Sequence, residues 1–109
     1  MSVDNKKVID LVSIDNDENV ILTITDHLEW DIENEHLLTL QDKINAYLEA
    51  IENGELYKRY ANAENKNISI RVVSLYPPNE EGKIFLGRVK GIVGTASYNF
   101  QFQRQSFTD

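Results

Sequence analysis

The residues with the clearest potential for chemistry are Asp26, His27 and His36, near the expected start of a long helix. Imidazole nitrogens and carboxylate oxygens bind divalent metals, so these three side chains are candidate metal ligands. The two histidines are nine positions apart, and this spacing does not hold both rings on one helix face. Capping and surface hydrogen bonding are the commoner uses of such histidines. The sequence therefore assigns no metal and keeps Asp26, His27 and His36 as candidates.

Catalytic and cofactor motifs are absent from the sequence. The chain has no cysteine, which excludes thiolate nucleophiles, disulfides and cysteine-ligated metals. The glycines from Gly87 to Gly94 match neither a dinucleotide fingerprint nor a P-loop, and there is no Gly-x-Ser-x-Gly. Carboxylates are plentiful, but no pair can be given acid and base roles without a pocket. The sequence predicts no catalytic residue and no cofactor, and it favours a role other than catalysis.

The charge of the chain is unevenly distributed. The formal net charge is −7, and residues 8 to 42 contain ten Asp and Glu residues and no Lys or Arg. Residues 67 to 109 carry three acidic and five basic residues. An acidic field repels phosphate backbones, so the sequence predicts no nucleic-acid partner and favours a basic protein. The candidate partner-binding residues are Glu29, Trp30, Asp31 and Glu33. Solubility alone is the simpler explanation of the acidic surplus.

One long helix is the element that must position these residues. Leucine, isoleucine and tyrosine recur at three- and four-residue steps, as on one face of a helix. A start between Asp31 and Asn34 and an end at Asn53-Gly54 fit the capping preferences of helices. Lys43 is expected on the solvent side. The apolar stripe consists of Leu37, Leu40, Ile44, Tyr47, Leu48 and Ile51.

The other apolar runs predict strands. Residues 8–14 and 20–25 should form a hairpin, with Val20, Leu22 and Ile24 buried. Apolar and polar side chains alternate in residues 68–75, which predicts a strand. Residues 83–90 are predicted to form the next strand, and Gly87, Gly91 and Gly94 suggest bulges or bends along it and after it. Tyr98, Phe100 and Phe102 alternate with polar residues and indicate a last strand. We therefore predict a single α+β domain over residues 1–109, with frayed ends at 1–7 and 105–109. Its sheet has about five mainly antiparallel strands in the order β-β-α-β-β-β, with one long helix on one face.

The run DHLEW, followed by EHLLTLQDKINAYLEAIENGE and by the strand at residues 68–78, resembles a family of small bacterial domains of unknown function. The resemblance covers residues 8 to 102 and is most specific in the helix and its aromatic lead-in. It implies a bacterial, intracellular, single-domain protein. The resemblance assigns no active-site role to any residue of this chain.

Three functional readings follow. The first is a non-catalytic protein-interaction domain, immunity-like or inhibitory, whose acidic half meets a basic partner. The second is a small metal-dependent enzyme or sensor that uses Asp26, His27 and His36. The third is a homodimeric structural protein that associates through the edge of its C-terminal strands. No window is apolar enough for a membrane span, and the N-terminus lacks a signal-peptide pattern, so a cytoplasmic location without membrane contact is expected.

Overall fold

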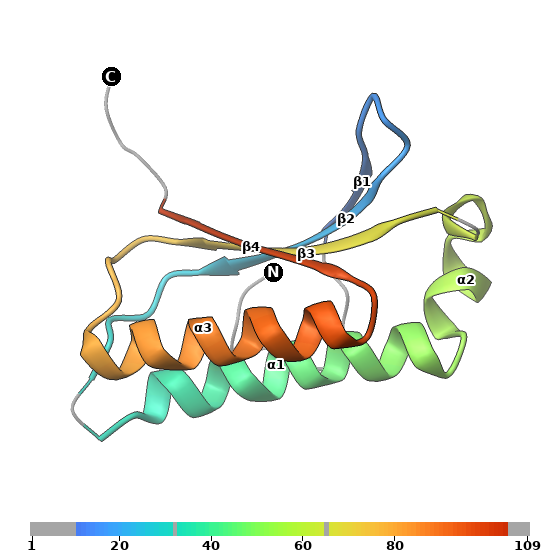
Figure 1. Cartoon of the computed structure of the whole chain (residues 1–109). Coiled ribbons are helices and arrows are strands. Elements are labelled where there is room, and N and C mark those ends of the chain that lie inside the picture. The colour runs from blue at the N-terminus through green and yellow to red at the C-terminus, as the bar shows by residue number, and fades with distance from the viewer. Residues whose placement is uncertain (1–10, 32, 65, 105–109) are drawn as a thin grey trace.

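The computed structural model describes residues 11–31, 33–64 and 66–104 (Figure 1). Within these ranges the chain is α+β, as predicted, with a four-stranded mixed sheet instead of five mainly antiparallel strands. No helix in these ranges is long and apolar enough to cross a membrane. The elements are β1 Leu11–Ile14, β2 Val20–Asp26, α1 Glu35–Glu52, α2 Glu55–Arg59, the 3-10 helix η1 Ala61–Ala63, β3 Ile68–Ser74, α3 Glu80–Thr95 and β4 Asn99–Arg104.

The strands lie in the order β1-β2-β3-β4. β1 and β2 are antiparallel, as the predicted hairpin requires, whereas β2, β3 and β4 are parallel. A parallel pair needs a long crossover, and α1 and α3 supply the two crossovers. Each crossover leads to the neighbouring strand, and both run in the same direction across the sheet, from β2 to β3 and from β3 to β4. Two right-handed connections in the same direction place both helices on the same face of the sheet. Figure 1 shows α1 and α3 together on that face.

The prediction of a strand at residues 83–90 is wrong, because these residues belong to α3. The helix begins after a proline pair, and the side chain of Asn79 caps it by accepting the backbone N–H of Gly82 at 2.8 Å. Leu86, Val89 and Val93 are buried at helical spacing.

The glycines of this segment suggested bulges, yet Gly87, Gly91 and Gly94 lie within the helix. A Cβ added at any of the three would have nothing within 4 Å. Burial of the leucine and valine face therefore outweighs the low helix propensity of glycine.

The long helix and the hairpin agree with the sequence. α1 ends at Glu52, and Gly54 follows in the left-handed region at φ 84°. In the β1–β2 turn, the Asp15 carboxylate accepts the backbone N–H groups of Asp17 and Asn19. The bonds from Asn19, the largest effect, lower the pKa of Asp15 below its usual range. β1 begins at Leu11, and the predicted start at Val8 lies outside the described residues.

The core lies between the sheet and the helices. Val20, Leu22 and Ile24 of β2 are buried, as predicted. The prediction that Lys43 faces solvent is wrong, since its side chain is 0% exposed and its Nζ lies 5.2 Å from the centre of the Tyr47 ring. Lys43 follows Leu40 by three residues and precedes Tyr47 by four, so the helical period places it on the buried stripe despite its charge.

Candidate functional site

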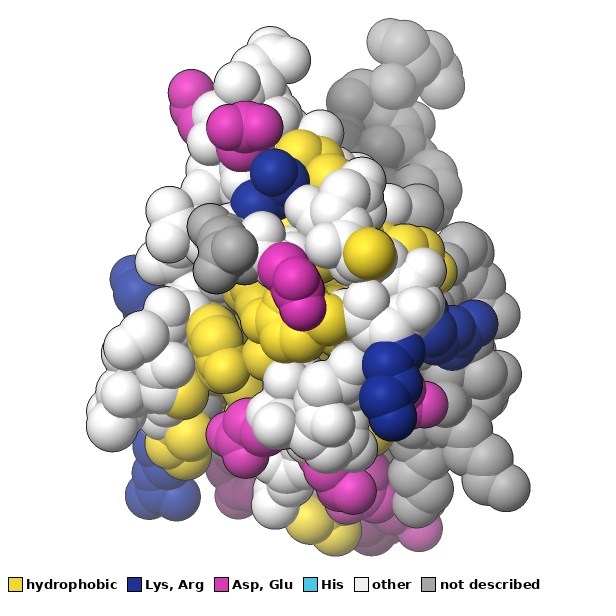
Figure 2. Space-filling model, turned by 90° about the vertical axis from the view of Figure 1, so that its right-hand side faces the viewer, with side chains coloured by type: hydrophobic (Ala, Val, Ile, Leu, Met, Phe, Trp, Pro, Cys, Tyr) yellow, Lys and Arg dark blue, Asp and Glu magenta, His cyan; other side chains and the backbone are white. Residues whose placement is uncertain are grey.

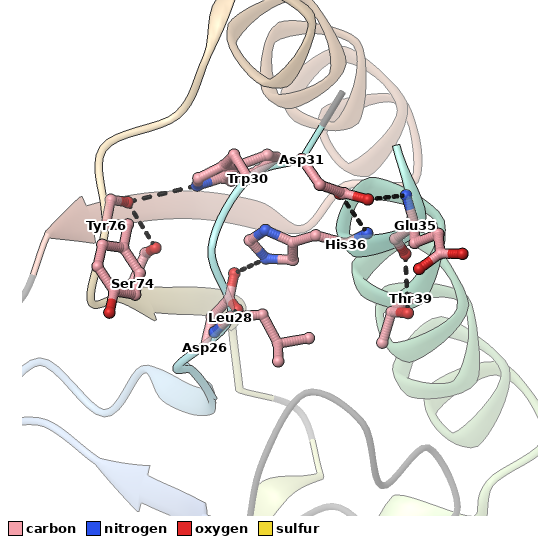
Figure 3. Close-up of polar contacts among 9 residues, drawn as sticks. All are labelled: Asp26, Leu28, Trp30, Asp31, Glu35, His36, Thr39, Ser74 and Tyr76. Atoms are coloured by element: carbon pink, nitrogen blue, oxygen red, sulfur yellow. Dashed lines mark hydrogen bonds and ion pairs between the residues drawn. The ribbon is translucent and has the colours of Figure 1, made fainter. Parts of the chain in front are cut away.

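A buried acid–imidazole pair joins the end of β2 to the start of α1 (Figure 3). His36 Nε2 lies 2.6 Å from Asp26 Oδ2. Asp26 is 2% exposed and His36 is 3% exposed. The other carboxylate oxygen of Asp26 accepts the backbone N–H of Leu28 at 3.2 Å. Both oxygens of this buried carboxylate are therefore hydrogen-bonded, as burial of such a group requires.

Trp30 covers this pair and links the segments that follow β2 and β3. Its ring centroid lies 4.1 Å from that of His36, with the planes at 47°. Its Nε1–H donates to the backbone oxygen of Tyr76 at 3.3 Å, and the Ser74 hydroxyl donates to the same oxygen at 2.8 Å (Figure 3). Trp30 packs against the hydrophobic core, so its main contacts are internal.

Asp31 caps the start of α1. Its two carboxylate oxygens accept the backbone N–H groups of Glu35 at 3.1 Å and His36 at 3.0 Å (Figure 3). The hydrogen bond from the His36 backbone is the largest effect that lowers the pKa of Asp31 below its usual range. Asn34 precedes the helix at φ 62°, and its side chain contacts the Glu81 carboxylate of α3. α1 begins at Glu35, directly after the Asp31–Asn34 range predicted for its start, with Asn34 as the residue that precedes it.

Gly82 of α3 packs against Trp30. A Cβ at this glycine would lie 2.7 Å from two carbons of the Trp30 ring, which is closer than van der Waals contact allows. We expect Gly82→Ala to lower the free energy of unfolding by about 1–3 kcal/mol, because the held ring cannot easily move. Gly91→Ala, in the same helix but in open space, should raise it by about 0.5–1 kcal/mol. Urea melts of both variants measure these changes, and equal effects would show that Trp30 does not constrain Gly82.

His36 contacts both Asp26 and Trp30 where β2 leads into α1. Of the three candidate metal ligands, the structure brings Asp26 and His36 together, whereas the His27 side chain is exposed. Among residues 11–31, 33–64 and 66–104 no group of three or more His, Cys, Asp or Glu side chains could hold a metal ion. His36 Nδ1 is buried and has no hydrogen-bond partner there. The pair joins the end of β2 to the start of α1, and both of its side chains are buried.

A groove between α1 and α3 is a second feature, which the sequence analysis missed. Its volume is about 510 Å³. Ile84 and Ile92 on its α3 side are 57% and 62% exposed, which is unusual for large aliphatic side chains. Recognition of α3 as a helix would have revealed these unburied isoleucines. The lining residues are Asn34, Leu37, Gln41, Ile44, Asn45, Leu48, Glu81, Ile84, Phe85, Arg88, Val89, Ile92 and Val93.

The two helices beside the groove differ in charge. The exposed charged residues of α1 are all acidic, while those of α3 after its first turn are all basic. Acidic side chains gather along the lower edge of the molecule in Figure 2, which is the helix side. The exposed charged residues are Glu35, Asp42, Glu49 and Glu52 on α1, and Glu80, Glu81, Lys83, Arg88 and Lys90 on α3.

The predicted partner-binding residues lie in the β2–α1 connection and have different surroundings. Trp30 and Asp31 are occupied by the internal contacts described above. Glu29 and Glu33 have exposed side chains. Of the four predicted residues, Glu29 and Glu33 are therefore the two that lack these internal contacts in the described structure.

Comparison with known proteins gives a family but no function. No curated protein and no solved structure matches the chain. A model described as Family of unknown function (DUF6572) matches residues 1–106. This match confirms the resemblance to a family of unknown function, and the chain belongs to that family.

Proposed function

We propose that this protein is a non-catalytic, cytoplasmic protein-interaction domain whose α1–α3 groove holds an amphipathic helix of a basic partner protein. The observation that carries the proposal is the open apolar groove between two long helices. Grooves of this kind bind the apolar face of a helix through side chains spaced three and four residues apart. α1 has 18 residues and is therefore roughly 27 Å long, enough to support several turns of a bound helix.

The charge of α1 supports a basic partner. Asp42, Glu49 and Glu52 are exposed on this helix, and Glu29 and Glu33 are exposed in the connection before it. These five acids do not line the groove, whose charged lining residues are Glu81 and Arg88. They act at a distance, because a negative surface attracts a basic partner and orients it before contact. Inhibition of a basic target protein is the form of binding that this surface suits.

The rate of association should respond to these charges. A partner captured from lysate of the source organism should bind Glu49→Lys and Glu33→Lys roughly tenfold more slowly than the unaltered protein, while dissociation changes less. Raised salt should slow the unaltered protein in the same way, because screening acts over about 8 Å at physiological ionic strength. Surface plasmon resonance at several salt concentrations measures both rates.

Glu64→Lys is the matched control for these variants. It makes the same charge change at an exposed residue after η1, away from α1 and from the connection before it. None of the three residues lines the groove itself. All three variants should unfold within about 0.5 kcal/mol of the unaltered protein. If Glu64→Lys slowed association as much as Glu49→Lys, the effect would come from net charge, and the proposed role of the acidic α1 surface would fail.

A second candidate role, homodimer formation, is favoured by a free sheet edge. β4 is the outermost strand and pairs on one side with β3. Its other side meets no strand in the described part of the chain. Such an edge exposes backbone N–H and C=O groups that can pair with another strand. The mass of the protein in solution tests this role.

A further inference from the structure

The edge of the sheet formed by β4 lacks the features that usually guard an edge strand. β4 has six residues, and its register with β3 is continuous from Asn99 to Arg104. Edge strands of monomeric proteins are usually short, bulged or guarded by lysine or proline. β4 has no lysine, proline or bulge, and its single charged residue is the terminal Arg104. Within the part of the chain that the structure describes, the β4 edge is therefore open to pairing.

We propose that two copies of this chain pair antiparallel through their β4 edges, centred on Gln101. The proposal rests on the second candidate role and is independent of what the groove binds. An antiparallel pair of identical strands has a twofold axis, and in one sheet that axis stands perpendicular to the sheet. Each face of one copy then continues as the same face of the other. Two residues that lie opposite each other across the axis must therefore have side chains on the same face of the sheet. Both side chains lie either on the face covered by α1 and α3 or on the opposite face, called the far face below.

The alternation of β4 fits this constraint. Phe100 and Phe102 pair in register with Ile70 and Val72, whose side chains belong to the core on the helix side. With Gln101 at the centre, Phe100 lies opposite the partner's Phe102. Both phenylalanines are only half-buried in one chain. Aromatic residues directly opposite each other stabilise antiparallel pairs, and this register forms two such pairs.

The far face of β4 is complementary in the same register. Gln101 lies opposite the partner's Gln101, and Asn99 lies opposite the partner's Gln103. All three side chains are exposed amides, which both donate and accept hydrogen bonds. The strand is thus self-complementary on both faces, with aromatic rings on one and amides on the other.

This pairing has a consequence for partner binding. Because the axis is perpendicular to the sheet, the helices of both copies lie on one side of a continuous sheet. The two α1–α3 grooves then open on the same side of the dimer. A target with two basic helices could occupy both grooves at once, which raises the effective affinity without new contacts.

Sedimentation equilibrium tests the pairing in the unaltered protein. We expect twice the chain mass of 12.5 kDa at high protein concentration. Gln101→Glu should weaken the dimer by about tenfold or more, because two carboxylates would lie directly opposite each other. Arg71 Nε–H donates to Gln101 Oε1 at 3.1 Å, and a glutamate keeps this acceptor, so each chain should stay folded. Gln41→Glu, the same chemical change in the groove, should leave the dimer unchanged.

A spectroscopic measurement tests the register. In a mixture of isotope-labelled and unlabelled protein, contacts between Phe100 and the partner's Phe102 should give intermolecular nuclear Overhauser effects. A chain that stays monomeric up to about millimolar concentration would overturn the proposal. A dimer that Gln101→Glu leaves intact, or one whose intermolecular signals come from Ile84 and Ile92, would overturn it as well. A monomer, or a dimer that Gln101→Glu leaves intact, does not affect the proposed role of the groove, which the charge variants test separately. Intermolecular signals from Ile84 and Ile92 would instead place a second copy at the groove and would contradict that role as well.

Discussion

Asp26→Ala should lower the free energy of unfolding by about 3–5 kcal/mol, the largest effect expected of any single substitution considered. The change leaves His36 buried beside a void, and it removes the acceptor of the Leu28 backbone N–H. It also loosens the segment that carries Trp30. Chemical denaturation followed by tryptophan fluorescence measures the loss, since Trp30 is the only tryptophan and its ring packs against that of His36.

Two further variants separate the pair from general charge effects. Asp26→Asn keeps a polar side chain that can still bond both partners, so it should cost less than Asp26→Ala. Asp17→Ala removes an exposed carboxylate and should change stability by no more than about 0.5 kcal/mol. If Asp26→Ala were as harmless as Asp17→Ala, the Asp26–His36 contact would not hold the domain together.

Leu40→Ala should cost about 2–5 kcal/mol, because Leu40 is fully buried between α1 and the sheet and the change leaves a cavity. Leu38→Ala is the matched control, since Leu38 lies two residues earlier in the same helix and is 55% exposed. It should cost less than about 1 kcal/mol. Guanidinium melts of the two variants compare the same chemical change on opposite faces of α1. Equal losses would mean that the buried face of α1 is wrongly assigned.

The sequence predicted the elements whose local signals agree with their tertiary setting. α1 has a long apolar stripe and a terminating glycine at Gly54, and both are found in the structure. Its start at Glu35 directly follows the predicted range from Asp31 to Asn34. β2, β3 and β4 follow from alternating or β-branched residues. The parallel pairing of β3 and β4 did not follow, because it depends on a helix between these two strands. The glycines of α3 concealed that helix, although Asn79 before two glutamates is a helix-start signal. The parallel pairing of β2 and β3 uses the predicted helix α1 as its crossover, and the preference for an antiparallel sheet was wrong there.

The candidate site was predicted only in part. Asp26 and His36 were singled out by residue type, but a sequence does not show that two side chains ten positions apart will meet. Their contact depends on how the β2–α1 connection turns back under Trp30. The groove could not be predicted, because it lies between two helices and one of them was read as a strand. Lys43 was wrongly predicted for a different reason. Its charge suggested the solvent side of α1, whereas its position in the helical period suggested the buried side, where the structure places it.

Site-specific photocrosslinking in cells of the source organism tests the binding role of the groove most directly. A photoreactive amino acid at Ile84 or Ile92 should give one adduct with a basic protein, and Glu49→Lys should reduce its yield. The same probe at Ile14, 39% exposed in β1 and outside the groove, should not give this adduct. Equal adducts from Ile14 and Ile84, or no adduct from either groove position, would contradict a groove that binds a basic helix.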